Sequence, residues 1–68
     1  MKIEIEIEIE EDGRWIAEIP DLPGALVYGI TREETISKIE VLALRILADR
    51  LEHGEKVADL EEFFRVAA

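Results

Sequence analysis

Glutamates at alternate positions near the start of the chain form its densest set of side chains that could do chemistry. They are Glu4, Glu6, Glu8 and Glu10, and isoleucines occupy the positions between them. In a β-strand, residues two apart lie about 6.6 Å apart on one face. Carboxylates in such a row attract cations, but they do not converge on one ion as the ligands of a metal site must. The row predicts a solvated acidic face, and we expect neither a metal site nor a cofactor.

Side chains suited to covalent or acid–base catalysis are scarce in the rest of the chain. The sequence has one histidine, His53, one serine, Ser37, and no cysteine. On a single helix these two residues lie about 24 Å apart, so they cannot act as a nucleophile and its base. Asp12 and Asp21 stand beside glycine or proline, where aspartate commonly forms turns. We therefore expect no catalytic residue and no enzyme activity.

The charge of the chain excludes one large class of partner. The 68 residues include 17 acidic and 8 basic side chains, a net charge of −9, and residues 1–31 alone account for −6. This charge repels phosphate backbones, so we expect no direct binding to nucleic acid. The aromatic side chains could stack on bases only if they lay on a basic sheet, and we expect them in the core or in an interface. They are Trp15, Tyr28, Phe63 and Phe64.

Length and hydropathy narrow the class of protein further. A chain of 68 residues makes one domain, spanning residues 1–68. No stretch approaches the ~18 apolar residues of a membrane span, and the charged first residues lack the apolar region of a signal peptide. We expect a cytoplasmic protein that does not bind membranes.

Three short strands are expected in the first half of the chain. The alternation of isoleucine and glutamate predicts a strand over residues 2–10 with one apolar and one polar face, and residues 14–19 predict a second strand. Two prolines make residues 20–24 a turn. Residues 25–28, ended by Gly29, predict a third strand whose apolar face the pattern does not identify.

The register of the first hairpin follows from the faces of the sheet. A loop of three residues places Gly13 in the left-handed conformation that such loops favour, and it pairs Glu10 with Arg14. A loop of two residues would mix apolar and acidic side chains on each face. The favoured register also sets Glu6 opposite Glu18, a like-charge pair.

A long helix is expected to follow the strands. Thr31 and Glu34 match the capping box at a helix start, which places the first turn at about residue 32. Gly54 stands where the residue after a helix end belongs. Apolar residues take up more than half of the circumference, which is wider than the stripe needed to cover one sheet. The excess predicts a contact with another subunit, and the candidate positions for it are Val41, Leu44 and Ala48.

The end of the chain allows two interpretations. Phenylalanine and valine in residues 62–67 favour a strand, whereas the acidic residues just before them could cap a short helix. We assign a fourth strand. It completes an α+β fold of order β-β-β-α-β, in which an antiparallel sheet carries one long helix on one face.

The small size of the chain also predicts self-association. For a domain of this mass, the free energy of burying apolar surface and the entropy of ordering the chain nearly cancel. Without cysteine no disulfide can stabilise the monomer, so we expect a homodimer or higher homo-oligomer. Phe63 and Phe64 join the helix positions as candidates for this contact.

The turns and the helix start resemble those of one known family. The residues that carry the resemblance are Asp12, Gly13, Pro20, Asp21, Leu22, Pro23, Gly24, Gly29 and Thr31. Their order and spacing resemble the HicB antitoxin family, and in particular its small stand-alone members of the UPF0150 type. The resemblance implies a partial ribonuclease H-like fold without catalytic acids. It also implies a function, which is to bind and neutralise a HicA-type toxin, a small basic ribonuclease that cuts mRNA.

An acidic face would attract such a partner. The residues expected to steer it are Glu4, Glu6, Glu8, Glu10 and Glu18. Longer HicB proteins carry a DNA-binding module, and we expect none in these 68 residues. The regular isoleucine–glutamate repeat also suits an engineered or idealised scaffold. A self-associating protein with no retained toxin partner therefore stands as the alternative function.

Overall fold

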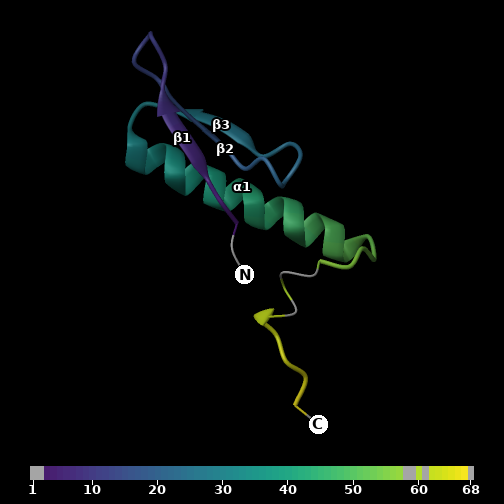
Figure 1. The fold of residues 1–68 in the computed structure, drawn as a ribbon. Helices are drawn as coiled ribbons and strands as arrows, with labels where there is room; N and C mark the ends of the chain where they lie inside the picture. Colours follow the sequence, from purple (N-terminus) through teal and green to yellow (C-terminus); the bar gives the residue numbers. More distant parts are fainter. Residues whose placement is uncertain (1–2, 58–59, 61, 68) are drawn as a thin grey trace.

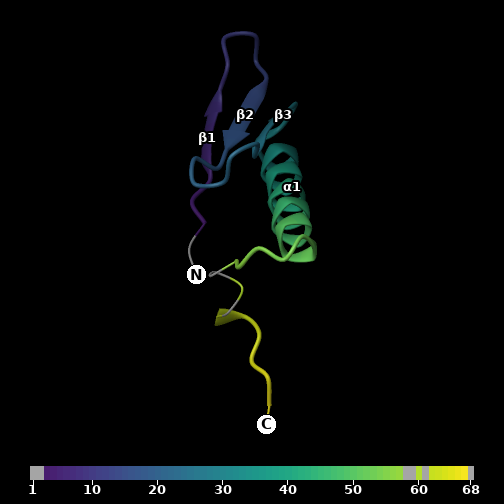
Figure 2. The same cartoon turned by 90° about the vertical axis from the view of Figure 1, so that its right-hand side faces the viewer.

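A computed structural model describes residues 3–57, 60 and 62–67 of the chain, and it confirms the α+β class (Figure 1). Within these residues the elements are β1 (Glu6–Ile9), β2 (Trp15–Glu18), β3 (Leu26–Gly29) and α1 (Arg32–Glu52). The strands form one antiparallel sheet in the order β1-β2-β3. The helix α1 lies along one face of this sheet and packs mainly on β2 and β3 (Figures 1 and 2).

The first hairpin has the predicted register. Glu6 lies opposite Glu18 and Ile9 opposite Trp15. The loop is closed by a hydrogen bond of 2.7 Å from the backbone N–H of Glu10 to the carbonyl oxygen of Arg14. Gly13 has a φ of 88°, the left-handed conformation that a three-residue loop needs at this place.

All three strands are shifted or shortened relative to the prediction. The strand expected over residues 2–10 begins only at Glu6, and its first residue lies outside the described part of the chain. The reason is the partner strand, because β2 ends at Glu18 and the chain then enters the turn at Pro20. Residues 3–5 consequently have no ladder partner in β2. The third strand is shifted by one residue and includes Gly29, which pairs with Trp15.

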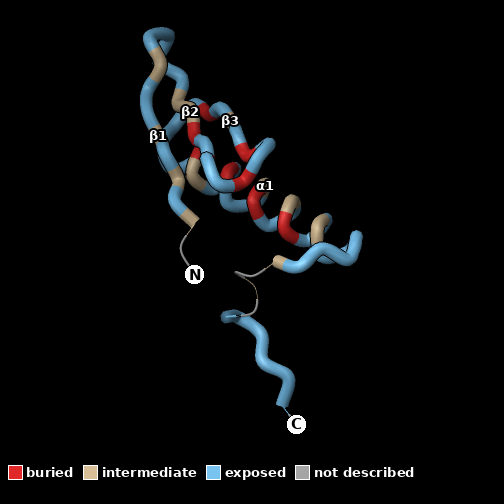
Figure 3. The backbone as a smooth tube through the Cα atoms, turned by 45° about the vertical axis from the view of Figure 1, so that its right-hand side comes forward, coloured by how far each residue is buried: buried red, intermediate tan, exposed pale blue. Residues whose placement is uncertain are grey.

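The core lies between the sheet and the helix, as the buried segments of Figure 3 show. The helix contributes Ile39, Ala43 and Leu47, which are one turn apart on one side. The sheet and its second turn contribute Ala17, Ile19, Leu22 and Ala25. The isoleucines at positions 3, 5 and 7 are only partly buried, because α1 lies over β2 and β3 and leaves the inner side of β1 less well covered.

Both ends of α1 are where the sequence predicts them. At the start, the hydroxyl oxygen of Thr31 accepts a hydrogen bond of 3.1 Å from the backbone N–H of Glu34. The Glu34 carboxylate accepts from the backbone N–H of Ile30 at 3.0 Å, one residue earlier than in a standard capping box. At the end, the N–H of Gly54 donates to the carbonyl of Leu51.

The predicted fourth strand is wrong. Residues 62–67 contain no strand, and a short 3₁₀ turn occupies Leu60 and Glu62. The N–H groups of Phe63 and Phe64 both donate to the carbonyl of Leu60, at 3.0 and 3.1 Å. Beyond this turn the chain runs away from the sheet (Figures 1 and 2), so the segment meets no strand edge with which it could pair.

Candidate partner-binding surface

The face of the sheet opposite α1 collects most of the residues that the sequence singled out for a partner. We call it the outer face, and its strand residues are Glu6, Glu8, Ile16, Glu18, Leu26 and Tyr28. They come together because side chains alternate along each strand and the hairpin register aligns the alternation across strands. Glu4 has the same parity and precedes β1, whereas Glu10 follows β1 and is half-buried.

Two rows of cross-strand neighbours divide the outer face into an acidic half and an apolar half. In one row Glu8 lies opposite Ile16, which lies opposite Tyr28. In the other row Glu6 lies opposite Glu18, which lies opposite Leu26. The β1 side therefore carries carboxylates, and the β3 side carries Leu26 and Tyr28, which are 43% and 42% exposed.

Sequence reasoning missed this apolar half. Residues 26 and 28 share a parity, but the turn before them contains two prolines and does not follow the two- or three-residue rules that set hairpin register. Its register becomes visible only in the hydrogen bonds that close it, from Ile19 N–H to the Ala25 carbonyl and from Ala25 N–H to the Leu22 carbonyl. The ladder with β2 then sets Leu26 opposite Glu18 and Tyr28 opposite Ile16, on the outer face.

A small polar cluster forms the edge of the apolar half near the first hairpin. The Arg14 guanidinium carbon lies 4.7 Å from the centre of the Tyr28 ring, a cation–π contact. The Asp12 carboxylate accepts from the Arg14 backbone at 3.1 Å and from its side chain at 2.7 Å. These hydrogen bonds, the backbone one first, lower the pKa of Asp12. Asp12 thus holds Arg14 over Tyr28 and also has its predicted place in the turn.

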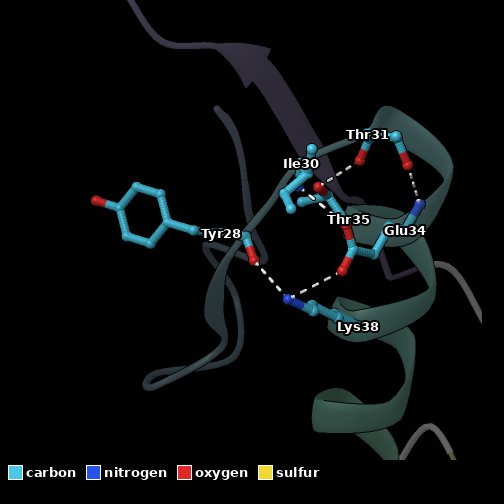
Figure 4. A network of polar contacts seen from close by, with 6 residues as sticks. All are labelled: Tyr28, Ile30, Thr31, Glu34, Thr35 and Lys38. Carbon is cyan, nitrogen blue, oxygen red and sulfur yellow. Dashed lines mark hydrogen bonds and ion pairs between the residues drawn. The ribbon is translucent and has the colours of Figure 1, made fainter. Parts of the chain in front are cut away.

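A second cluster ties the backbone of Tyr28 to the helix (Figure 4). The Lys38 ammonium donates to the Tyr28 carbonyl at 3.2 Å and lies 3.4 Å from the Glu34 carboxylate. The hydrogen bond from the Ile30 backbone, and then the one from Lys38, lower the pKa of Glu34. The spacing of Glu34 and Lys38 is a helical i, i+4 signal that could have been read from the sequence.

The outer face is shallow and rich in carboxylates. A shallow hollow of about 150 Å³ lies among Glu6, Glu8, Ile16 and Glu18. In the described part of the chain no three His, Cys, Asp or Glu side chains are placed to hold a metal ion. His53 caps the end of α1, with its Nδ1 2.7 Å from the Asp49 carbonyl. The carboxylates lie spread along the sheet, an arrangement that suits the ammonium and guanidinium groups of a protein partner.

The residues predicted for self-association lie elsewhere. Val41 and Leu44 are 50% and 65% exposed, and Ala48 is exposed too. Phe63 and Phe64 are 64% and 72% exposed. The two phenylalanines, with Leu44, line an apolar hollow of about 320 Å³ between the helix and the last segment. None of the five belongs to the outer face, so their role in assembly stays a prediction.

Among the helices that the structure describes, none is long and apolar enough to cross a membrane.

Comparison with known proteins gives one clear relationship. The chain is 30% identical over 57 residues to a UPF0150 protein of Thermoplasma acidophilum, and the match covers 84% of this chain and 83% of that protein. No family model matches the chain. No solved structure matches it either.

Proposed function

The chain belongs to the UPF0150 family, and on that premise we propose that it is a HicB-like antitoxin module that neutralises a small basic ribonuclease of the HicA type. The observation that carries the proposal is the outer face, where a row of carboxylates borders an exposed apolar strip. The turn and helix-start residues that resemble the HicB family add support. The neutralisation is a protein–protein contact, with no reaction catalysed by this chain.

The acidic half of the outer face supports the first stage of such a contact. A ribonuclease needs positive charge to hold RNA, and this chain carries a net charge of −9. Complementary charge raises the rate of encounter and orients the partner before contact. Glu6, Glu8 and Glu18 are exposed and gather on one side of the sheet, where their fields add.

The apolar half supports the second stage, which is a lasting complex. Aromatic and arginine side chains commonly anchor protein interfaces, because they combine a large apolar area with polar groups. Tyr28 stands in the outer face with Arg14 stacked on its ring. The Lys38 contact holds the Tyr28 backbone in place, so little further ordering is needed when a partner binds.

The acidic half can be tested by association kinetics with a HicA-type ribonuclease from the same source. In one variant Glu6, Glu8 and Glu18 become glutamine. A control variant removes the same charge from the helix and the segment after it, at Glu33, Glu52 and Glu55. We expect the first variant to lower the association rate about tenfold at 50 mM salt and the control to change it little. At 300 mM salt the difference should largely disappear.

The apolar half can be tested by the dissociation rate and by protection of mRNA. Tyr28→Ala should raise the dissociation rate about tenfold and leave the association rate nearly unchanged. Val41→Ala, on the helix, is the matched control.

Association rates that are equal in all variants and at both salt concentrations would remove the acidic face from the proposal. If no HicA-type ribonuclease of the source is inhibited, the self-associating scaffold becomes the better account of the protein.

A further inference from the structure

The helix α1 carries a second, mostly apolar stripe whose residues are exposed. Its residues are Ser37, Val41, Leu44, Ala48 and Leu51, and we call them the helix seam. Successive residues of a helix rotate by about 100°, which places Val41 and Ala48 roughly opposite the buried Ile39 and Ala43. All five seam residues are exposed.

The spacing of the helix seam is that of a coiled coil. Its residues recur at intervals of four, three, four and three positions, the 3.5-residue period of two helices that wind around each other. The buried stripe beneath it recurs at intervals of four, at Thr35, Ile39, Ala43 and Leu47, as suits a flat sheet. In heptad terms Val41 and Ala48 occupy a positions and the two leucines occupy d positions. Val41 is β-branched, and among parallel coiled coils a β-branched residue at a with leucine at d favours two strands.

We propose that two copies of this chain pair through the helix seam, with their α1 helices parallel. In a parallel pair, each g residue faces the e residue five positions further along the other helix. The flanking g residues are Glu33 and Glu40, and the residues five positions on are Lys38 and Arg45. Each of these two contacts joins opposite charges and occurs twice in a symmetric dimer. Lys38 shares its ammonium with Glu34 and the Tyr28 carbonyl of its own chain, so the two Glu40–Arg45 contacts are the stronger ones.

In an antiparallel pair of helices, fewer oppositely charged e and g residues face each other. There, e residues face e residues, so that Arg45 of one copy meets Arg45 of the other at the centre of the seam, while Lys38 meets Glu52. The Glu40–Arg45 attraction is lost at the same time. Charge complementarity therefore favours a second copy of the chain as the occupant of the helix seam, with its α1 parallel to the first.

The sheet leaves the helix seam exposed, and of the seam residues Leu44 also lines the hollow beside Phe63 and Phe64. The sheet packs on the other side of α1 (Figure 2), so the sheets of two copies lie on the outside of the dimer. Their outer faces remain free. The helix is already formed and capped in a single copy, so pairing need not drive its folding. The seam is about two heptads long and smaller than a standard interface of roughly 1,600 Å², which predicts a micromolar dissociation constant.

A single cysteine reports the direction of the helices, because the sequence has no cysteine of its own. Ser37→Cys places the two thiols side by side in a parallel pair and roughly 25 Å or more apart in an antiparallel one. We expect mild oxidation to yield a disulfide-linked dimer of the S37C variant. Asp49→Cys, exposed on a different side of the same helix, is the control and should stay monomeric in denaturing electrophoresis.

Charge reversal tests the pairing without introduced cysteines. By sedimentation equilibrium, Glu40→Lys should raise the dimer dissociation constant about tenfold, since two attractions become repulsions. The double variant Glu40→Lys and Arg45→Glu restores opposite charges and should return the constant to near its original value. Circular dichroism of each variant confirms that the helix is intact.

Three results would overturn the proposal: an unsubstituted protein that remains monomeric at 100 µM and above, no S37C disulfide from a dimeric protein, or a double variant that dimerises more weakly than Glu40→Lys alone. None of these depends on a ribonuclease partner, so the antitoxin proposal stands or falls separately.

Discussion

At the scale of single residues, the sheet and the helix meet most closely at Gly29 and Thr35. A Cβ at Gly29 would overlap the Thr35 hydroxyl and come within 3.1 Å of its Cβ. Thr35 cannot move aside easily, because it is fully buried and its hydroxyl donates to the Thr31 carbonyl at 2.7 Å. The glycine is therefore needed for close approach, and its predicted role as the end of the strand is only part of its function.

Gly29→Ala should lower the free energy of unfolding by about 1–3 kcal/mol, the usual cost of forcing extra atoms into a packed site. Urea denaturation measures it. A double variant with Thr35→Ala tests the mechanism, since removing the threonine hydroxyl and methyl should make the glycine substitution less costly in that background. If the double variant loses the sum of the stabilities that the two single variants lose, the clash between position 29 and Thr35 is contradicted.

Glu34 makes the start of the helix sensitive to acid. Hydrogen bonds from the Ile30 backbone and then from Lys38 hold the pKa of Glu34 below its ordinary value of 4.5. The ionised carboxylate therefore stabilises the fold fully above about pH 4.5, and this contribution is lost as the pH falls through the lowered pKa.

The melting temperature of Glu34→Gln should accordingly be lower than that of the unsubstituted protein at pH 7, and the difference should shrink between pH 4.5 and pH 2. Thermal melts at several pH values measure it, with Glu33→Gln in the same helical turn as control. A difference that persists undiminished at pH 2 would show that the carboxylate charge is not responsible.

At the scale of elements, the hairpin of β1 and β2 has a well-determined register that brings two glutamates opposite each other. The alternation of isoleucine and glutamate aligns β1 and β2 so that apolar residues face the helix, and the same alignment sets Glu6 against Glu18. Like charges directly opposite each other destabilise a sheet. The outer face thus keeps its acidic half at some loss of stability, which is consistent with a role in binding.

Glu18→Gln should raise the free energy of unfolding by roughly 0.5 kcal/mol, because it removes this repulsion. Glu4→Gln, on the same side but before the paired part of β1, should change stability less. Chemical denaturation at 20 mM and 500 mM salt measures both, and the gain should fall at high salt. A Glu18→Gln protein of unchanged or lower stability at low salt would refute the repulsion.

At the scale of the whole molecule, the two proposed interaction surfaces lie on opposite sides. The outer face belongs to the sheet and the helix seam to the far side of α1, with the core between them (Figures 2 and 3). Sites that share no residue and lie well apart usually act independently. The helix seam can therefore join two copies while each sheet remains open to a partner.

Leu44→Glu should abolish the dimer and leave the rate of ribonuclease association per chain within about twofold, because the substitution is remote from the outer face. Conversely, glutamine at positions 6, 8 and 18 should leave the dimer dissociation constant within about twofold. Sedimentation and stopped-flow measurements on the same variants test this. Loss of both activities in either variant would show that the surfaces are coupled.

The sequence by itself determined the features that depend on neighbours along the chain. Alternation in residues 2–10 gave a strand with an acidic face, the loop ending at Gly13 set the register of β1 and β2, and Thr31 and Glu34 marked the start of α1. Each is a local rule in which a few adjacent side chains and backbone groups decide the outcome. The exposed positions of the helix were also visible, because helical periodicity assigns each residue to a side.

Only the tertiary structure decided what depends on distant partners. The outward direction of Leu26 and Tyr28 follows from the pairing of β3 with β2, which is set by a double-proline turn that no local rule describes. Residues 62–67 have strand-forming side chains, yet they form no strand, because a strand requires an edge within hydrogen-bonding reach and the turn at Leu60 leads away from one. The need for glycine at position 29 likewise arises from Thr35, which approaches it only when the helix packs on the sheet.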